Sequence, residues 1–275
     1  VMKCNLKSLL FFVLVIFAPQ AVVAKDLGNS EPGFSGRLQA GAVFVQTDSQ
    51  LLATDSDSIN FSLEGPADKY DEASPIASLY LNYKFEGGTS IYAGNPLQVG
   101  EALNLAAGVK QPIGDSTLDV ALTWLPVKEV WKNPYQTARS RQESDADVYG
   151  LRFKVLDIGG SPWEASYSID HIAIENDEIG DLENDLKRDG LVHELGVKYT
   201  LQLQKGVSLR PELNYIYGDI KGQSNRYHGG NIGVKLQKIL PSWVLIWQVS
   251  GFHNQYQQTH PLFGETRQES GISTF

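Results

Sequence analysis

The chain has 275 residues, and its 23 lysines and arginines stand against 32 aspartates and glutamates, a formal net charge of −9. Apolar residues make up 42%, too few for a bundle of membrane-spanning helices, and the acidic balance argues against nucleic-acid binding. An aromatic content of 10% argues against disorder, and the only cysteine, Cys4, excludes an internal disulfide.

Residues 1–24 have the composition of an export signal. Two lysines precede an apolar run at residues 8–18, and small residues follow as far as Ala24. The run is too short to span a membrane as a helix, which favours a cleaved signal peptide over an N-terminal anchor. Cys4 precedes the run, so we expect no lipoprotein anchor. We predict cleavage near Ala24 and a single barrel domain at residues 25–275.

Beyond the signal, apolar and polar residues alternate with a period of two over segments of about ten residues, the length of a tilted membrane-spanning strand. Pro211 lacks an amide hydrogen and is expected near a strand end or bulge. The predicted strands lie near residues 34–46, 75–85, 89–95, 101–111, 115–125, 146–157, 162–174, 190–203, 207–218, 230–239 and 242–255, with a last one from 269.

The connections between these strands are alternately short and long. The short ones are residues 86–88, 111–114, 158–161, 204–206 and 240–241; the long ones are 47–74, 126–145, 175–189, 219–229 and 256–268, with a modest one at 96–100. This alternation is typical of tight periplasmic turns and larger extracellular loops. We therefore predict an all-β fold, an antiparallel up-and-down transmembrane β-barrel of about 12 strands, or about 14 in a complete chain.

The two faces of the predicted strands differ in charge. The apolar face, which includes Leu79, Leu105, Leu122 and Leu201, carries no ionisable acid or base. One charged side chain facing the middle of a bilayer costs about 2–4 kcal/mol, so lipid selects such a face. The opposite face carries the candidate lumen-lining residues Arg37, Lys84, Asp119, Arg152, Lys154, Glu164, Lys198, Arg210, Glu212 and Lys235.

A soluble barrel or sandwich would show the same two faces turned inside out, and composition alone does not separate the alternatives. The aromatic residues of the apolar face do, because they gather at strand ends, as in the two belts of a membrane interface. The expected extracellular belt is Phe44, Trp124, Tyr149, Tyr215 and Tyr217, and the expected periplasmic belt is Tyr83, Phe85, Trp163 and Trp243.

No motif indicates catalysis or metal binding. The five histidines have no metal-ligand spacing, and no G-x-S-x-G sequence occurs. His171 and His193 fall on the apolar face near strand ends, where an interfacial position explains them. The acidic segments 47–74 and 175–189 do not fit a calcium loop and are interpreted as solvated loops. We expect no catalytic residue, no metal and no cofactor.

The charges of the polar face suggest cross-strand pairs that fix the register. A tight turn at 204–206 brings Lys198 opposite Glu212, and a turn at 158–161 lets Lys154 face Glu164. Bases outnumber acids on this face, which could favour anionic solutes, whereas the acidic loops oppose them. Selectivity is therefore left open.

Four stretches of the chain carry a family resemblance: EPGFSG at residues 31–36, YAGN at 92–95, LPVKEVWKNPY at 125–135 and HPLFGET at 260–266. They resemble an uncharacterised family of proteobacterial outer-membrane proteins, known only as a domain of unknown function. The resemblance implies a Gram-negative outer-membrane barrel and assigns no substrate or catalytic residue. Similar proteins continue beyond the position of Phe275, so we expect this chain to be truncated at its C-terminus.

The predicted function is a porin-like outer-membrane channel that passes or binds small polar solutes. The alternatives are a non-conducting structural or surface-interaction barrel and, less favoured, a barrel enzyme with a Ser, Asp or His cluster at one rim. The expected partners are outer-membrane lipid, lipopolysaccharide, periplasmic chaperones and the barrel-assembly machinery. The expected location is the outer membrane of a Gram-negative bacterium.

Overall fold

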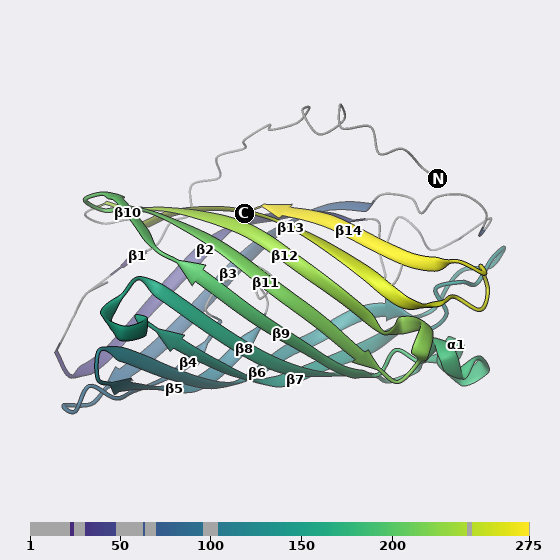
Figure 1. Ribbon diagram of the computed structural model, residues 1–275, viewed down its shortest axis with the longest axis horizontal. Coiled ribbons are helices and arrows are strands. Elements are labelled where there is room, and N and C mark those ends of the chain that lie inside the picture. Colours follow the sequence, from purple (N-terminus) through teal and green to yellow (C-terminus); the bar gives the residue numbers. More distant parts are fainter. Residues whose placement is uncertain are drawn as a thin grey trace.

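The strands form one antiparallel sheet that closes into a twelve-stranded barrel, because β2 pairs with both β3 and β14 (Figure 1). The computed structural model describes residues 23–24, 31–47, 63, 70–95, 104–240 and 244–274. The wall strands are β2 (Gly33–Thr47), β3 (Tyr70–Lys84), β4 (Ser90–Gly94), β5 (Leu105–Ile113), β6 (Ser116–Trp131), β7 (Glu143–Leu156), β8 (Trp163–Ile174), β9 (Gly190–Tyr199), β11 (Val207–Ile220), β12 (Tyr227–Ile239), β13 (Val244–Thr259) and β14 (Thr266–Thr274). The predicted fold class is confirmed.

Short extra elements lie at the ends and edges of this wall. β1 (Val23–Ala24) pairs with β2, and β10 (Leu201–Gln204) pairs with β11. The helices are α1 (Glu178–Leu182) and the 3₁₀ turns η3 (Ile158–Gly160), η4 (Asn184–Leu186) and η5 (Gln223–Asn225). Figure 1 shows α1 and the β13–β14 connection at one end of the barrel and the β10–β11 turn at the other. No helix in the described part of the chain is long and apolar enough to cross a membrane.

The barrel is apolar outside and polar inside. Leu122 is 65% exposed on the outer wall, and Leu79, Leu105 and Leu201 are exposed as well. Gln39, on the inner wall, is only 2% exposed, and polar side chains outnumber apolar ones among the buried residues that the structure describes. Lipid rather than water is the solvent that favours this distribution.

Several strands are longer than the segments in which apolar and polar residues alternate. The predicted loop 126–145 contributes to two strands, because β6 continues through a register shift between Leu125 and Lys128 as far as Trp131. Likewise β13 reaches Thr259 and β14 begins at Thr266, so the predicted loop 256–268 was too long. Where a strand continues beyond the lipid, its outer face no longer needs to be apolar. The alternation of apolar and polar residues therefore ends before the backbone hydrogen bonds between the strands do.

The predicted strand 190–203 is interrupted between β9 and β10. The ladder from β9 to β11 ends at Lys198 opposite Glu212, and the ladder from β10 begins at Leu201 opposite Leu209. Pro211 lies in this gap and has no amide hydrogen to offer a neighbour, which accounts for the break.

The barrel closes between its last and first wall strands. Within the described residues, β14 pairs with β2 from Phe44 to Thr47, and it pairs with β13 from Val249 onward. The ring contains twelve strands, as predicted for this chain, and the count of about fourteen for a complete chain stays a prediction. Val23 and Ala24 form β1, and the rest of the predicted signal peptide lies outside the described residues, so its cleavage stays a prediction.

Candidate functional site: the inner wall and the extracellular mouth

The predicted lumen-lining residues all lie on the inner side of the wall. Asp119, Arg152, Lys154, Glu164 and Glu212 are buried there. The remaining five are half-buried: Arg37, Lys84, Lys198, Arg210 and Lys235. Bases and acids from different strands thus face the same enclosed space, although whether they line a conduit is a separate, functional question.

One of the two predicted cross-strand pairs is present. Lys198 lies opposite Glu212, with 3.5 Å between Nζ and Oε2. The prediction that Lys154 faces Glu164 was wrong, since Lys154 lies opposite Ser166. The connection contains η3 and is longer than a tight turn, which moves the register by two residues.

Glu164 is instead the partner of bases on the other side of β8. It lies opposite Lys198 in the ladder and forms an ion pair with Arg210. Arg210 in turn lies directly opposite Lys235, a like-charge pairing that costs stability unless an acid compensates it. Charge is therefore concentrated along the inner faces of β8 to β12.

A second polar network lies on the other half of the inner wall. The Tyr92 hydroxyl donates to Asp119 Oδ1 at 2.6 Å and accepts from Arg152 Nη2 at 3.2 Å. Lys110 Nζ lies 5.1 Å from the centre of the Tyr92 ring, within cation–π range. The Arg37 guanidinium lies 5.5 Å from the Tyr80 ring centre. Cations and aromatic faces alternate along this part of the wall.

Large inner side chains lie flat against the wall, over glycines of neighbouring strands. A Cβ atom added at Gly108 would lie 2.7 Å from the Tyr92 hydroxyl oxygen, and one at Gly233 would lie 2.7 Å from Glu212 Oε1. The Tyr227 ring covers Gly218 in the same way. This packing accounts for the burial of Glu212 without requiring its side chain to cross the lumen.

The barrel end that carries α1, which we predict to be extracellular, is crossed by two loops from opposite sides of the barrel. Residues 132–142 (L3) join β6 to β7, and residues 260–265 (L6) join β13 to β14. Around the ring, four strands separate these two hairpins on either side. Any contact between L3 and L6 therefore spans the opening.

Such a contact is formed by Tyr135 of L3, which we group with His260, Phe263 and Arg267 as the mouth cluster. The Tyr135 ring centre lies 4.7 Å from that of His260 and 5.6 Å from that of Phe263. The Tyr135 hydroxyl accepts a hydrogen bond of 3.0 Å from Arg267 Nη1 on β14. His260 is fully buried in this cluster.

Two further loops are tied to the same cluster: residues 175–189 (L4) and residues 221–226 (L5). Arg188 of L4 donates from Nη1 to the Trp131 carbonyl, where L3 begins, at 2.7 Å. Asn225 of L5 donates to the Leu186 carbonyl at 2.7 Å and accepts from Arg267 Nη2 at 3.1 Å. L3, L4, L5 and L6 thus form one hydrogen-bonded unit over the mouth.

Burial controls protonation in this unit. Desolvation, reinforced by the positive charge of Arg267, lowers the pKa of His260 to about 4. His260 Nδ1 accepts from the Leu262 amide at 3.3 Å, which only the neutral ring does. Burial also raises the pKa of Tyr135, so its hydroxyl stays protonated.

Sequence reasoning missed part of this site. Lys110 and Asp170 occupy polar-face positions of predicted strands, so the same alternation would have found them. Arg267 was assigned to the predicted loop 256–268. Tyr135 and His260 lie within stretches that carried the family resemblance, but Tyr135 and Arg267 are 132 positions apart, and no local pattern shows that they meet.

The predicted aromatic belts lie on the outer wall. The exposed members are Phe44, Tyr83, Phe85, Trp124, Tyr149, Trp163 and Tyr215. Tyr217 is half-buried against His193 and His228. Trp243 lies outside the described residues.

Among the described residues no group of three or more His, Cys, Asp or Glu side chains could hold a metal ion.

A closed antiparallel barrel with an apolar outer wall and a charged inner wall defines an outer-membrane β-barrel protein. The chain belongs to the family described as "Protein of unknown function (DUF2860)", whose model matches residues 33–275. The resemblance to an uncharacterised outer-membrane family is thereby confirmed, whereas the proteobacterial origin stays a prediction.

Solved structures of other outer-membrane proteins are similar to this chain at low identity. OmpT of Vibrio cholerae is 13% identical, with 87% of this chain and 76% of that chain covered and a TM-score of 0.44. An anion-selective porin from Comamonas acidovorans is 9% identical, with 91% and 85% covered and a TM-score of 0.34. A BenF-like porin from Pseudomonas fluorescens Pf-5 is 9% identical, with 90% and 64% covered and a TM-score of 0.34. No curated protein matches the chain significantly.

Proposed function

We propose that this barrel is an outer-membrane channel for small polar solutes, entered through a mouth that the L3–L6 contact narrows. The observation that carries the proposal is the polar inner wall, on which charged side chains from many strands face one enclosed space and two of them, Glu212 and Asp170, lie over glycines of neighbouring strands. A structural plug could be built from apolar side chains at lower cost, whereas a hydrated path requires a polar wall. The proposal includes no catalysis, and the absence of enzyme activity stays a prediction.

The inner wall favours anionic solutes. Among the side chains that the structure describes in the wall strands, its bases are Arg37, Lys84, Lys110, Arg152, Lys154, Lys198, Arg210, Lys235 and Arg267; its acids are Asp119, Glu164, Asp170, Glu194, Glu212 and Glu269. An excess of fixed positive charge raises the local concentration of anions and lowers that of cations. We therefore expect chloride to permeate more readily than potassium.

Conductance across planar bilayers tests the proposal, with the wild-type barrel compared with Tyr135→Ala. Removing the Tyr135 ring breaks the contact between L3 and L6, so the variant should conduct at least twofold more than the wild type. In a potassium chloride gradient, the reversal potential should have the same sign as the equilibrium potential of chloride, because chloride is expected to permeate more readily than potassium. Leu262→Ala is the matched control, because Leu262 lies in L6 but is 50% exposed.

The second candidate function is a non-conducting barrel that acts through its extracellular surface. The hydrogen-bonded union of four loops over the mouth favours it, since a fixed cap blocks passage and presents a defined surface. The same experiment separates the two functions. If neither the wild type nor Tyr135→Ala conducts, the channel proposal fails and the non-conducting barrel takes its place.

A further inference from the structure

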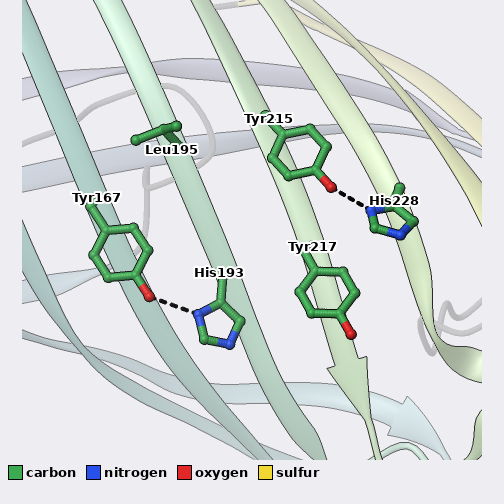
Figure 2. A pocket seen from close by; sticks show the side chains of 6 residues that line it. All are labelled: Tyr167, His193, Leu195, Tyr215, Tyr217 and His228. Carbon is green, nitrogen blue, oxygen red and sulfur yellow. Dashed lines mark hydrogen bonds between the residues drawn. The ribbon is translucent and has the colours of Figure 1, made fainter.

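The outer wall contains a groove at the extracellular ends of β9, β11 and β12 and the middle of β8. It encloses about 330 Å³ and is lined by Tyr167, His193, Leu195, Tyr215, Tyr217 and His228 (Figure 2). We call it the ring groove. L4 leads into His193 and L5 leads into His228, so the groove lies just below the loops on the lipid-facing side.

Four of its rings form a stack across the strands. The ring centres of Tyr167 and His193 lie 6.2 Å apart, those of His193 and Tyr217 6.0 Å, and those of Tyr217 and His228 4.9 Å. The interplanar angles are 29°, 23° and 26°. Four neighbouring strands, β8, β9, β11 and β12, thus present a nearly continuous aromatic surface, which suits the apolar faces of sugar rings.

Hydrogen bonds fix how both histidines sit in this stack. The Tyr167 hydroxyl lies 2.8 Å from His193 Nδ1, and the Tyr215 hydroxyl is hydrogen-bonded to His228 Nδ1 (Figure 2). Neither histidine has a hydrogen bond at Nε2 within the described residues. When the tyrosine hydroxyl donates, the ring proton lies on Nε2, which then acts as a donor to a ligand.

Polar ring nitrogens on a lipid-facing wall are unfavourable unless they meet a partner. The interfacial position that we predicted for His193 explains a ring at this depth but not an imidazole in a fixed orientation, because tyrosine and tryptophan suffice for a belt, as the exposed Trp124 and Trp163 of this wall illustrate. Two imidazoles held in fixed orientation by tyrosines therefore indicate a recognition surface rather than simple anchoring.

A band of opposite charges lies immediately outside the ring groove. Asp219 follows Tyr217 by two positions on β11 and therefore projects on the same side of the strand, and Arg226, the last residue of L5, lies beside it. Arg226 Nε lies 3.5 Å from Asp219 Oδ1, and Lys221 Nζ lies 3.3 Å from Asp189 Oδ2. Exposed ion pairs of this kind contribute little stability, so their bases are available to a competing anion.

We propose that the ring groove binds the headgroup of a phosphorylated glycolipid of the outer leaflet. The sugar rings stack on the tyrosine faces, and a phosphate accepts hydrogen bonds from histidine Nε2 and from Arg226. The order of the bands matches the order of the lipid's own parts: apolar wall for acyl chains, rings for sugars, bases for phosphate. Charge complementarity at Arg226 and Lys221 selects the phosphorylated form. The proposal requires the outer-membrane location but no channel activity.

Native mass spectrometry of the detergent-solubilised barrel tests the proposal, with bisphosphorylated lipid A as the probe. Dephosphorylated lipid A keeps the sugar rings and tests whether binding needs the phosphates. Phosphatidylglycerol keeps a phosphate but has no sugar ring and tests whether binding needs the sugars. We expect the bisphosphorylated probe to bind at least tenfold more tightly than either of the others. Equal binding of all three lipids would overturn the proposal.

The double variant His193→Phe and His228→Phe keeps four stacked rings but removes both ring nitrogens. It should lose at least tenfold in affinity for bisphosphorylated lipid A, whereas His253→Phe should not, because His253 is exposed outside the groove. Heat-modifiable mobility in electrophoresis verifies that each variant is folded. Unchanged affinity in the folded double variant would refute the proposal. A cysteine placed at Leu195 gives a second check: if its labelling is blocked by association with a second copy of the chain, the groove is a protein interface and the proposal is refuted.

Discussion

His260 is held in its neutral form by the residues around it. Tyr135 and Phe263 exclude water from the ring, and Arg267 supplies the nearest positive charge. The pKa of His260 is about 4 in the closed mouth against an ordinary value of 6.5 in water. Between these values the open form binds more protons than the closed one, so the closed mouth loses stability as pH falls from 6.5 toward 4.

We predict that acidification releases L6 from L3. Hydrogen exchange of the amides at residues 260–265, referred to an unstructured peptide at the same pH, should rise between pH 7 and pH 4. His260→Phe keeps the aromatic contact but removes the titration, so its exchange should not depend on pH in this way. Equal pH dependence in both proteins would show that another group controls the loop.

The glycines beneath inner side chains give a second prediction at this scale. In Gly233→Ala, the added Cβ lies 2.7 Å from Glu212 Oε1, so Glu212 must leave the wall and its contact with Lys198. We expect the free energy of unfolding in urea to fall by about 1–2 kcal/mol. Gly230→Ala on the same strand meets nothing closer than 3.5 Å and serves as the control. An equal loss in both variants would contradict the role assigned to the glycine.

At the scale of elements, L3 and L4 are held together by one side chain. Arg188 donates from Nε to Asp177 Oδ1 at 2.8 Å and reaches two carbonyls at the start of L3, those of Trp131 and Lys132. The ion pair is almost completely buried, so removal of the guanidinium leaves an unpaired carboxylate.

Arg188→Ala is therefore predicted to loosen both loops together. Hydrogen exchange should increase at residues 132–142 and at residues 175–189, whereas exchange in the wall strands stays unchanged. Arg188→Lys is the matched control for charge, and it should rescue only in part, because the compact ammonium group lacks the planar fork whose separate nitrogens reach Asp177 and both carbonyls. An effect confined to L4 would show that Arg188 does not couple the loops.

The wall strands were predictable from sequence because lipid imposes a strict rule on their outer face. Between Leu118 and Trp124 of β6, every second residue is apolar, and this period alone identifies the strand. The rule ends where lipid ends, so the extracellular extensions of β6 and β13 carry no such signal. The register across η3 was wrong because it depends on the conformation of a connection, which face composition does not specify.

At the scale of the whole molecule, it was harder to predict which face of the strands points outward than to predict the strands themselves. Apolar and polar faces are equally compatible with a soluble barrel, so the preference for lipid outside rested on the export signal, the alternation of short and long connections and the aromatic ends of the strands. The mouth cluster was beyond prediction for a different reason. Its members come from hairpins on opposite sides of the ring, so their meeting depends on closure of the barrel, which a single sequence does not display.

The direction of the two faces is tested most directly by cysteines placed one at a time along β3 in a chain with Cys4 replaced by serine. Fluorescent labels at Leu79 and Leu81 should be quenched by lipids with brominated acyl chains. Cysteines at Tyr80 and Asn82 should instead react with a small water-soluble thiol reagent and show no such quenching. Quenching at Tyr80 and Asn82, or at none of the four positions, would contradict a barrel that faces lipid with its apolar side.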